Sequence, residues 1–295
     1  MGQSPRHSCG TIIMNDKFFA TLQYAIPQHT LSRVAGWLAN TTIPWIKDPF
    51  TSWFVKRYDV NMSEALEENP LAYKSFNDFF TRALKEGARE ICPEPKAIAC
   101  PADGAISQLG DIEYGRIFQA KGQDYSLEEL LGGNSERAHD FVGGKFATVY
   151  LSPKDYHRVH MPLAGKLRAM IHVPGDLFSV NEATANEVPR LFSRNERVVT
   201  IYDTDAGPMA VVLVGAMIVA SIETVWAGQV TPVTRSIREW HYPLDAIELA
   251  KGDEIGRFKL GSTAIVLFGP DVMNWEATLS AGSPTLMGEE MGVLI

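Results

Sequence analysis

The stretch MAVVLVGAMIVASI, residues 209–222, is the longest uncharged apolar run in the chain. Its fourteen residues fall short of the roughly 20 that a helix needs to cross a bilayer. Gly215 divides the run into two halves that are rich in valine and isoleucine, as buried strands are. We therefore expect two β-strands, Met209–Val214 and Ala216–Ile222, and no membrane-spanning segment.

Short runs of the same kind follow one another from about Ile98 onward, separated by proline, glycine and aspartate. Further strands are expected at Phe146–Leu151, Arg197–Tyr202 and Ala264–Phe268. Helices are expected between them at Ser126–Leu131 and Asn181–Phe192, the second ended or kinked by Pro189. The pattern predicts an α+β fold, in which residues 61–295 form a strand-rich domain of packed, mostly antiparallel sheets.

The N-terminal part is patterned as helices instead. Apolar residues recur three and four positions apart in two series, which are Leu31, Val34, Ala35 and Leu38, and then Phe50, Trp53 and Phe54 with Arg57. Farther on, Ser63 before Glu64–Glu67 and Ser75 before an apolar run are candidate helix N-caps. We expect residues 1–60 to form a region of amphipathic helices, with more helix within residues 62–90.

Charge is distributed unevenly between these two parts. The chain has 27 basic and 35 acidic residues, a net charge of −8, which argues against a nucleic-acid binder. Residues 1–60 have six basic and three acidic residues, a net charge of +3, so the remainder carries −8 − 3 = −11. The same region has Trp37, Trp45 and Trp53. Such a segment suits a membrane interface, where rings lie at headgroup level and cations meet anionic lipid, but packing on the body as core is the alternative.

The cysteines and histidines limit the chemistry. Three scattered cysteines, Cys9, Cys92 and Cys100, form neither a disulfide framework nor a Cys-x-x-Cys metal site, and they fit a reducing compartment. His157 and His160 lie three residues apart in Tyr-His-Arg-Val-His, without a third ligand nearby. We therefore expect no metal site.

Three loops together supply the parts of an activated serine nucleophile. Asp103 lies in Pro-Ala-Asp-Gly, the two histidines follow, and Ser262 lies in Leu-Gly-Ser-Thr. Each could be an ordinary turn, and Gly282-Ser283 repeats the glycine-serine pair elsewhere. The Gly-x-Ser-x-Gly elbow of common hydrolases is absent from the Ser262 segment. From the residues alone, the purpose of this aspartate, histidine and serine stays open.

Five motifs in a fixed order are more specific than any one of them. They are Pro-Ala-Asp-Gly at 101–104, Tyr-His-Arg-Val-His at 156–160, Pro-Gly-Asp-Leu-Phe-Ser-Val-Asn at 174–181, Arg-Asn-Glu-Arg-Val at 194–198 and Leu-Gly-Ser-Thr at 260–263. With them the chain resembles the bacterial phosphatidylserine decarboxylase proenzyme family, from about Phe18 to Phe268. Residues 1–14 carry no motif of that family.

The resemblance implies that the chain cuts itself. Ser262 would attack the carbonyl carbon of Gly261, and the resulting ester would break by β-elimination. The products would be residues 1–261, the β chain, and residues 262–295, an α chain of 295 − 261 = 34 residues. Ser262 would become a pyruvoyl group at the new N-terminus.

The resemblance also implies roles for other residues. Asp103 and His160 match the residues that activate the serine, with the carboxylate holding the imidazole in the correct tautomer. His157 and Ser179 match residues linked to the later decarboxylation, and Phe178 beside Ser179 is a candidate for substrate contact. The strand-rich domain is then the catalytic domain.

The implied reaction is the decarboxylation of phosphatidylserine. The pyruvoyl group forms a Schiff base with the amine of the lipid and acts as the electron sink, so that CO2 leaves and phosphatidylethanolamine is formed. Because this substrate lies at a membrane surface, we expect residues 1–60 to hold the protein peripherally on the anionic, cytoplasmic side of the cell membrane. We also expect a homodimer.

Three other functions are compatible with the residues. A pyruvoyl decarboxylase of a soluble amino acid or of adenosylmethionine would use the N-terminal helices only as core. A non-enzymatic lipid-binding or scaffold protein would keep Ser262 unreacted. A serine hydrolase would use Asp103, His160 and Ser262 on an external substrate.

Overall fold

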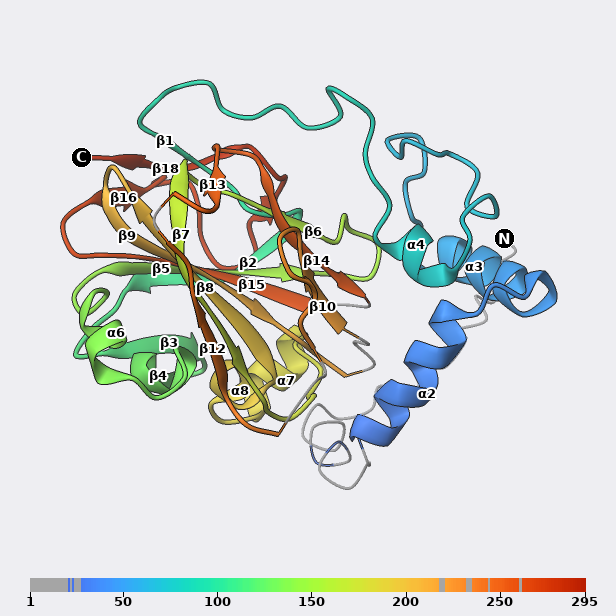
Figure 1. Ribbon diagram of the computed structural model, residues 1–295, viewed down its shortest axis with the longest axis horizontal. Helices are drawn as coiled ribbons and strands as arrows, with labels where there is room; N and C mark the ends of the chain where they lie inside the picture. The colour runs from blue at the N-terminus through green and yellow to red at the C-terminus, as the bar shows by residue number, and fades with distance from the viewer. Residues whose placement is uncertain are drawn as a thin grey trace, which may run out of the picture.

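The computed structural model describes residues 21, 23, 28–217, 221–231, 235–243, 245–259 and 262–295. Its central feature is a nine-stranded antiparallel sheet (Figure 1). In order across the sheet the strands are β12 (Arg238–His241), β7 (Gly165–Val173), β8 (Arg197–Thr204), β9 (Gly207–Val214), β15 (Ser262–Phe268), β5 (Lys145–Leu151), β2 (Gly104–Asp111) and β17 (Pro284–Thr285), with β13 (Glu248–Leu249) also paired to β7. All seven residues of β15 are buried, because this strand lies inside the sheet and both its faces are covered.

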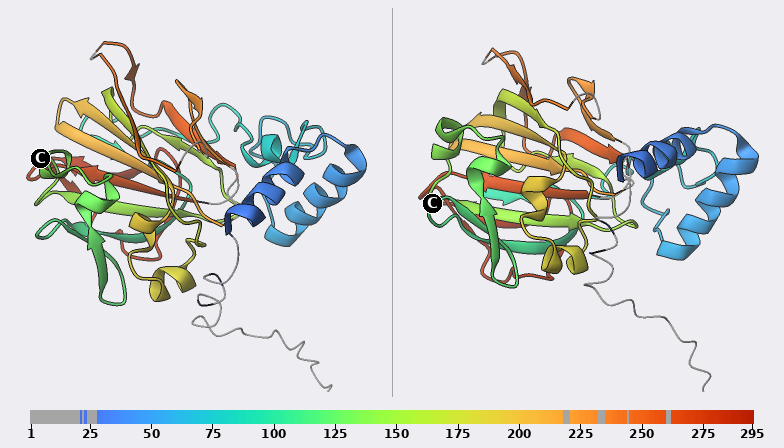
Figure 2. Two further views of the ribbon diagram at one scale, coloured as in Figure 1. Left: turned by 60° about the horizontal axis from the view of Figure 1, so that its bottom comes forward. Right: turned by 90° about the horizontal axis from the view of Figure 1, so that it is seen from below.

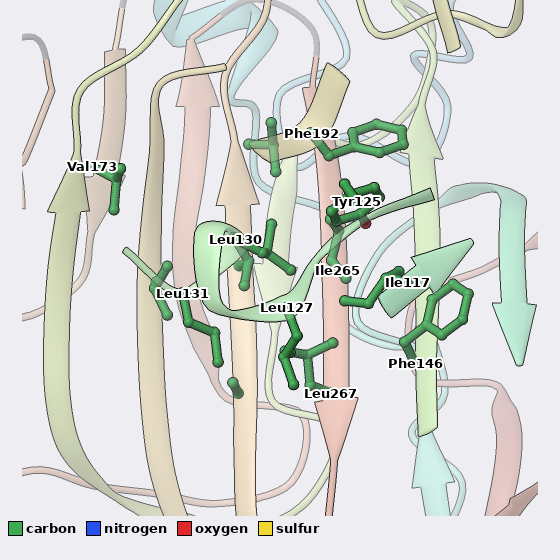
Figure 3. Packing of buried hydrophobic residues seen from close by; sticks show 14 of the residues in the cluster. Ile117, Tyr125, Leu127, Leu130, Leu131, Phe146, Val173, Phe192, Ile265 and Leu267 are labelled. Atoms are coloured by element: carbon green, nitrogen blue, oxygen red, sulfur yellow. The ribbon is translucent and has the colours of Figure 1, made fainter. Parts of the chain in front are cut away.

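One face of the large sheet is covered by short helices and a two-stranded hairpin. These elements are β3 (Arg116–Ala120), β4 (Gln123–Ser126), α5 (Leu127–Leu130), α6 (Ser135–His139), α7 (Glu182–Glu187) and α8 (Leu191–Arg194). Figure 3 shows Leu127 and Leu130 of α5 beside Ile265 and Leu267, which alternate along β15. Since all four are fully buried, this cluster fixes which face of β15 points toward the helices.

The opposite face is covered by two smaller sheets. One contains β11 (Gly228–Gln229), β10 (Ser221–Thr224), β14 (Glu254–Lys259) and β6 (Arg158–His160), and the other contains β1 (Ala97–Ala99), β18 (Glu290–Leu294) and β16 (Met273–Trp275). Ile222 of β10 and Phe258 of β14 belong to one buried cluster with Ala264 and Val266 of β15. The sheet that contains β14 is therefore packed over β15, the strand that follows β14 in the chain.

Three helices stand at one end of the sheets, opposite the end where the C-terminus lies (Figure 2). They are α2 (Gln28–Asn40), α3 (Pro44–Tyr58) and α4 (Phe76–Phe80). Phe54 of α3 packs with Phe76, Phe79 and Phe80 of α4, and these side chains form an aromatic core of their own. No helix in the described part of the chain is long and apolar enough to cross a membrane.

The structure confirms the predicted α+β fold and most of its expected elements. The strands expected at Met209–Val214, Phe146–Leu151, Arg197–Tyr202 and Ala264–Phe268 lie in β9, β5, β8 and β15. The two apolar series of the N-terminal region lie in α2 and α3. Ser75 caps α4 by accepting a hydrogen bond from the N–H of Asp78, and Ser126 caps α5 in the same way.

The prediction of a helix after Ser63 was wrong. Residues 64–66 pair with residues 83–85 instead, through hydrogen bonds of 2.9 Å from Leu66 N–H to the carbonyl of Ala83 and from Lys85 N–H to the carbonyl of Glu64. A long-range main-chain pairing therefore replaces the local helix that the serine and glutamate residues favoured.

Two further expectations are corrected in part. The single helix expected over Asn181–Phe192 is two helices, α7 and α8, because Val188 takes the extended conformation that a following proline favours. In the second half of the opening apolar run, residues 218–220 lie outside the described residues. The strand on that side, β10, begins only at Ser221.

Candidate active site

Ser262 is the first residue of β15. Its main chain pairs with Leu151 of β5, and the next residue, Thr263, pairs with Val214 of β9 as well. The Ser262 side chain is fully buried, and within the described part of the chain its Oγ has no hydrogen-bond partner. A buried hydroxyl without a partner costs free energy, so it calls for an explanation such as chemistry.

The chain changes sheets immediately before Ser262. Lys259 ends β14 in the four-stranded sheet, whereas Ser262 begins β15 in the nine-stranded one. Gly261, the expected cleavage partner, and Leu260 lie outside the described residues. The expected scissile bond thus falls where the backbone passes from one sheet to the other.

His157 is fully buried close to this crossing. Its Nδ1 lies 2.8 Å from the carbonyl oxygen of Asp155, which can only accept, so Nδ1 carries the proton. Nε2 is therefore an acceptor, and none of the described residues donates a hydrogen bond to it. Burial lowers the pKa of His157 to about 3, so the ring is neutral at physiological pH. The carbonyl of His157 accepts from Phe258 N–H at 3.0 Å, four residues before Ser262.

His160 is held differently. Its Nδ1 lies 2.7 Å from the carbonyl of Gly252, and its Nε2 lies 3.0 Å from the Tyr156 hydroxyl. Burial lowers the pKa of this imidazole as well. His160 pairs with Glu254 at the start of β14, eight residues before Ser262, so along β14 it lies farther from Ser262 than His157 does.

Asp103 is occupied by other partners. Its carboxylate accepts from Arg89 through Nε (2.9 Å to Oδ1) and Nη2 (2.5 Å to Oδ2), and from Met287 N–H at 2.8 Å. The hydrogen bonds to Asp103 raise the pKa of Arg89, which also bonds to Glu64 at 2.9 Å. We expected the Asp103 carboxylate to hold the His160 ring, but the carbonyl of Gly252 holds it instead.

Asp103 and His160 nevertheless lie in adjoining segments. His160 N–H donates to the carbonyl of Pro101 at 2.8 Å, which places β6 against the Pro-Ala-Asp-Gly loop. Gly104 in this loop has φ +151°, and a Cβ there would lie 2.1 Å from the carbonyl oxygen of Tyr150. Only glycine permits β2 to approach β5 this closely directly after Asp103.

The loop 174–181 lies near the Ser262 end of β15. The carbonyl of Phe178 accepts from Met217 N–H at 3.3 Å, three residues beyond the Val214 that pairs with Thr263. Both main-chain groups of Phe178 also bond to the Asn195 side chain, at 3.1 and 2.8 Å. The Phe178 ring belongs to the helix-covered core. Its position is therefore that of a packing residue that fixes the loop.

Ser179, in the same loop, is half-buried. Its N–H donates to the Gln23 side chain at 2.8 Å, and its carbonyl accepts from the Thr184 hydroxyl at 2.6 Å. The N-terminal part of the chain thus contacts this loop directly. The described residues include no group of three or more side chains that could hold a metal ion.

Sequence reasoning missed the side chains that reach the site from residues 76–89. The Phe80 ring packs on His157, and Arg89 holds Asp103. Arg82 donates from Nη2 to the carbonyls of Lys154 and Asp155, at 3.0 and 3.4 Å. The apolar pattern of the Phe-Phe-Thr-Arg stretch predicted a packed helix, but nothing in it identified the residues on which the helix packs.

Comparisons with known proteins agree with the motifs. A family model described as phosphatidylserine decarboxylase matches residues 76–293, and one described as PSD matches residues 18–59. The phosphatidylserine decarboxylase proenzymes of Pseudomonas putida strain F1 and Pseudomonas fluorescens strain Pf0-1 are each 62% identical over 281 residues, 94% of this chain and 98% of theirs. That of Pseudomonas entomophila is 62% identical over 283 residues, 95% of this chain and 99% of its own.

Proposed function

This chain belongs to the phosphatidylserine decarboxylase family, and from that premise we propose that it cleaves itself between Gly261 and Ser262 and then decarboxylates phosphatidylserine. One observation carries the proposal. The Ser262 hydroxyl is fully buried, and no described residue hydrogen-bonds to it, at the start of an interior strand where the chain passes between two sheets. The buried Thr263 hydroxyl next to it also lacks a described partner, so what distinguishes Ser262 is its place directly after the crossing, beside the peptide bond that would break.

Self-cleavage needs a nucleophile and a base. The Ser262 Oγ adds to the Gly261 carbonyl carbon, the Oγ proton goes to an imidazole, and the Gly261–Ser262 C–N bond breaks to leave an ester. We assign the base to His160 and its electrostatic support to Asp103, as the family motifs suggest. Elimination then releases the carboxylate of Gly261 and leaves a dehydrated residue, which water and loss of ammonia convert into the pyruvoyl group.

The site fits a pyruvoyl group at residue 262. The position is buried, its main chain pairs with Leu151, and the next residue, Thr263, pairs with Val214. On the adjoining segment, no described residue bonds to the acceptor Nε2 of His157. A pyruvoyl carbonyl supplies an electron-withdrawing centre to which the amine of the substrate can bond. His157, kept neutral by burial and with its proton on Nδ1, presents Nε2 as a hydrogen-bond acceptor.

A membrane surface is the partner that suits the N-terminal helices. Trp37 is 66% exposed, Trp45 77% and Trp53 53%, although all three lie on helices that bury other side chains in the aromatic core. Lys56 and Arg57 are exposed beside them in α3. Exposed rings next to cations bind at the headgroup level of an anionic bilayer. We therefore propose peripheral binding to the cytoplasmic face of the cell membrane through residues 1–60.

A decarboxylase of a soluble amino acid is the alternative. The exposed tryptophans disfavour it, because a soluble substrate gives no reason to leave three large rings in water.

Mass spectrometry of the purified protein tests the proposal. We expect a chain ending at residue 261 and a 34-residue chain whose N-terminus is blocked as pyruvoyl, together with release of CO2 from phosphatidylserine. Ser262→Ala should stay in one piece and release no CO2. A free serine amine on the small chain, or cleavage of the Ser262→Ala variant, would refute the mechanism.

A further inference from the structure

Arg82 is a buried cation whose hydrogen bonds are incomplete. The residue is 4% exposed and follows α4 in the chain. Nη2 donates to the carbonyls of Lys154 and Asp155, but the buried Nε has no partner among the residues that the structure describes. Among the described residues no carboxylate forms an ion pair with this guanidinium. Asp103, Asp155 and Glu64 act on this charge through space, and its Cζ lies 5.7 Å from the centroid of the Phe79 ring, but none of these groups accepts a hydrogen bond from Nε. A buried donor of a charged group without an acceptor is costly, so an anion bonded directly to it is the natural complement.

Arg197 provides an internal comparison. It is 2% exposed and also has no carboxylate partner among the described residues, but its guanidinium is enclosed by carbonyls. Nε donates to Leu130, Nη1 to Ser193 and Asn195, and Nη2 to Glu129. All three nitrogens of Arg197 are thus satisfied by the main chain alone, as expected of a structural arginine. Arg82 lacks that complete set of acceptors.

The place of Arg82 connects it to the candidate active site. The carbonyls that it holds belong to the turn that joins the end of β5 to His157. Leu151, the last residue of β5, pairs with Ser262. Arg82 Nη2 and His157 Nδ1 share the carbonyl oxygen of Asp155, at 3.4 and 2.8 Å, so the two side chains meet at this turn. In the part of the chain that the structure describes, neither Nε of Arg82 nor Nε2 of His157 has a hydrogen-bond partner.

We propose that Arg82 binds an oxyanion of the phospholipid substrate. A guanidinium presents planar N–H donors that match the oxygens of a phosphate or a carboxylate, and a buried one binds them strongly. The proposal rests on the function proposed above, because it assumes a phospholipid in the site. It adds a residue that holds the substrate, in addition to those that would react with it.

The phosphate is the oxyanion that the chemistry favours. A cation on the carboxylate would stabilise the charged ground state more than the transition state, in which the charge leaves that group, and would slow the reaction. The phosphate charge is the same in substrate, transition state and product. A cation there holds the lipid without opposing the loss of CO2.

Two variants and a matched control test the proposal. Arg82→Gln removes the charge but keeps an amide that can donate to the carbonyls of the turn. Arg82→Lys keeps the positive charge but replaces the planar guanidinium with a compact ammonium group. The control is Lys154→Gln, which removes an exposed cation from the same turn. Wild-type cleavage and CO2 release are measured first, so that failure of the proposed function is recognised separately.

The measurements use the matured fraction of each variant. KM and kcat are determined with short-chain phosphatidylserine, and calorimetry measures the binding of short-chain phosphatidylethanolamine, which has the phosphate but no carboxylate. We expect Arg82→Gln to raise KM at least tenfold, Arg82→Lys to raise it less, and Lys154→Gln to stay within twofold of wild type. Self-cleavage on a gel should be normal in all three.

The two arms separate the possible oxyanions. If Arg82→Gln raises KM and weakens the binding of phosphatidylethanolamine to a similar extent, the bound oxyanion is the phosphate. A raised KM with unchanged product affinity assigns the carboxylate. The proposal is overturned if both Arg82 variants keep KM and product affinity within twofold of wild type. It is equally overturned if they lose cleavage or thermal stability while the molecules that do mature bind normally, since Arg82 would then be structural.

Discussion

The rings of Phe80 and His157 lie against one another, with their centroids 3.9 Å apart and their planes at 40°. Phe80 comes from α4, and its other ring neighbours are Phe54 of α3 and Phe76. Phe50 and Phe76 are in contact in turn, with centroids 4.6 Å apart, and Phe50 stacks on the exposed Trp53. A continuous series of aromatic contacts therefore runs from the solvent-exposed surface of α3 to a buried imidazole of the candidate site.

Replacement of Phe80 by leucine should raise the pKa of His157. The present value of about 3 is caused mainly by burial, and a smaller side chain admits water beside the ring, which favours the charged form. An NMR titration of the imidazole measures the shift. Phe141→Leu is the matched control, because Phe141 is equally buried but belongs to the separate helix-covered core. Equal pKa values in the two variants would contradict the prediction.

The same imidazole should make stability depend on pH. The folded-state pKa lies below the unfolded value of about 6.5, so its contribution to stability is complete above pH 6.5 and is lost as the pH falls toward 3. Each such proton changes the unfolding free energy by up to about 1.4 kcal/mol per pH unit. Urea unfolding of Ser262→Ala, which stays a single chain, should show a steeper loss of stability between pH 6.5 and 4 than Ser262→Ala/His157→Gln. Identical slopes would mean that His157 titrates alike in both states.

The two histidines should separate cleavage from decarboxylation. His160→Ala should stay uncleaved on a gel, because removal of a general base costs about 10²- to 10⁴-fold in rate. Asp103→Asn should also stay uncleaved, because the Asp103 charge favours the protonated form of His160. His157→Ala should mature but turn over phosphatidylserine slowly. The reverse pattern, with His157→Ala uncleaved and His160→Ala processed, would transfer the role of base to His157, which lies nearer to Ser262 along β14.

Loss of the exposed tryptophans should release the protein from membranes. The variant Trp37→Ser/Trp45→Ser/Trp53→Ser leaves the aromatic core intact, whereas deletion of the helices would uncover Phe76, Phe79 and Phe80. Flotation with anionic liposomes should fall at least tenfold in this variant. Tyr114→Ser, which removes a 97% exposed ring at another surface, should float like wild type.

Salt provides a second test of membrane binding. Each cation near an anionic surface contributes on the order of 1 kcal/mol, which salt screens, whereas burial of the rings persists. Moderate salt should therefore weaken the binding of the wild-type protein only partly. Complete release at high salt would show that the contact is purely ionic.

The parts of the molecule that could be predicted are those determined by local pattern. Ala264–Phe268 could be identified as a strand because an interior strand is apolar throughout, and the two apolar series marked α2 and α3. The Ser262 hydroxyl was singled out through its motif. The sequence does not show which distant groups serve as hydrogen-bond partners of each side chain. The Gly252 carbonyl lies 92 residues from the His160 that it holds, and Arg82 lies 73 residues from Asp155.

The same limit explains the one misplaced partner. The Asp-His-Ser set suggests a carboxylate on the imidazole, but the Asp103 carboxylate instead accepts two charge-assisted hydrogen bonds from Arg89. A backbone carbonyl then fixes the tautomer of His160 equally well. No spacing in the sequence distinguishes a carbonyl from a carboxylate in this role, because every residue supplies a carbonyl.

The interior position of β15 has a consequence for the mature protein. Cleavage before Ser262 would leave a 34-residue peptide hydrogen-bonded along both edges, to β5 on one side and β9 on the other. To dissociate, the peptide would have to break its main-chain hydrogen bonds to both strands and expose a strand that is buried along its whole length. Cleavage would thus make refolding a bimolecular process instead of a unimolecular one, while the strand pairing of the native state stays the same. After thermal unfolding, the single-chain precursor would refold in a unimolecular step, whereas the two chains of the mature protein would first have to associate in solution. Maturation would therefore make unfolding harder to reverse, and the stability of the mature protein would be kinetic.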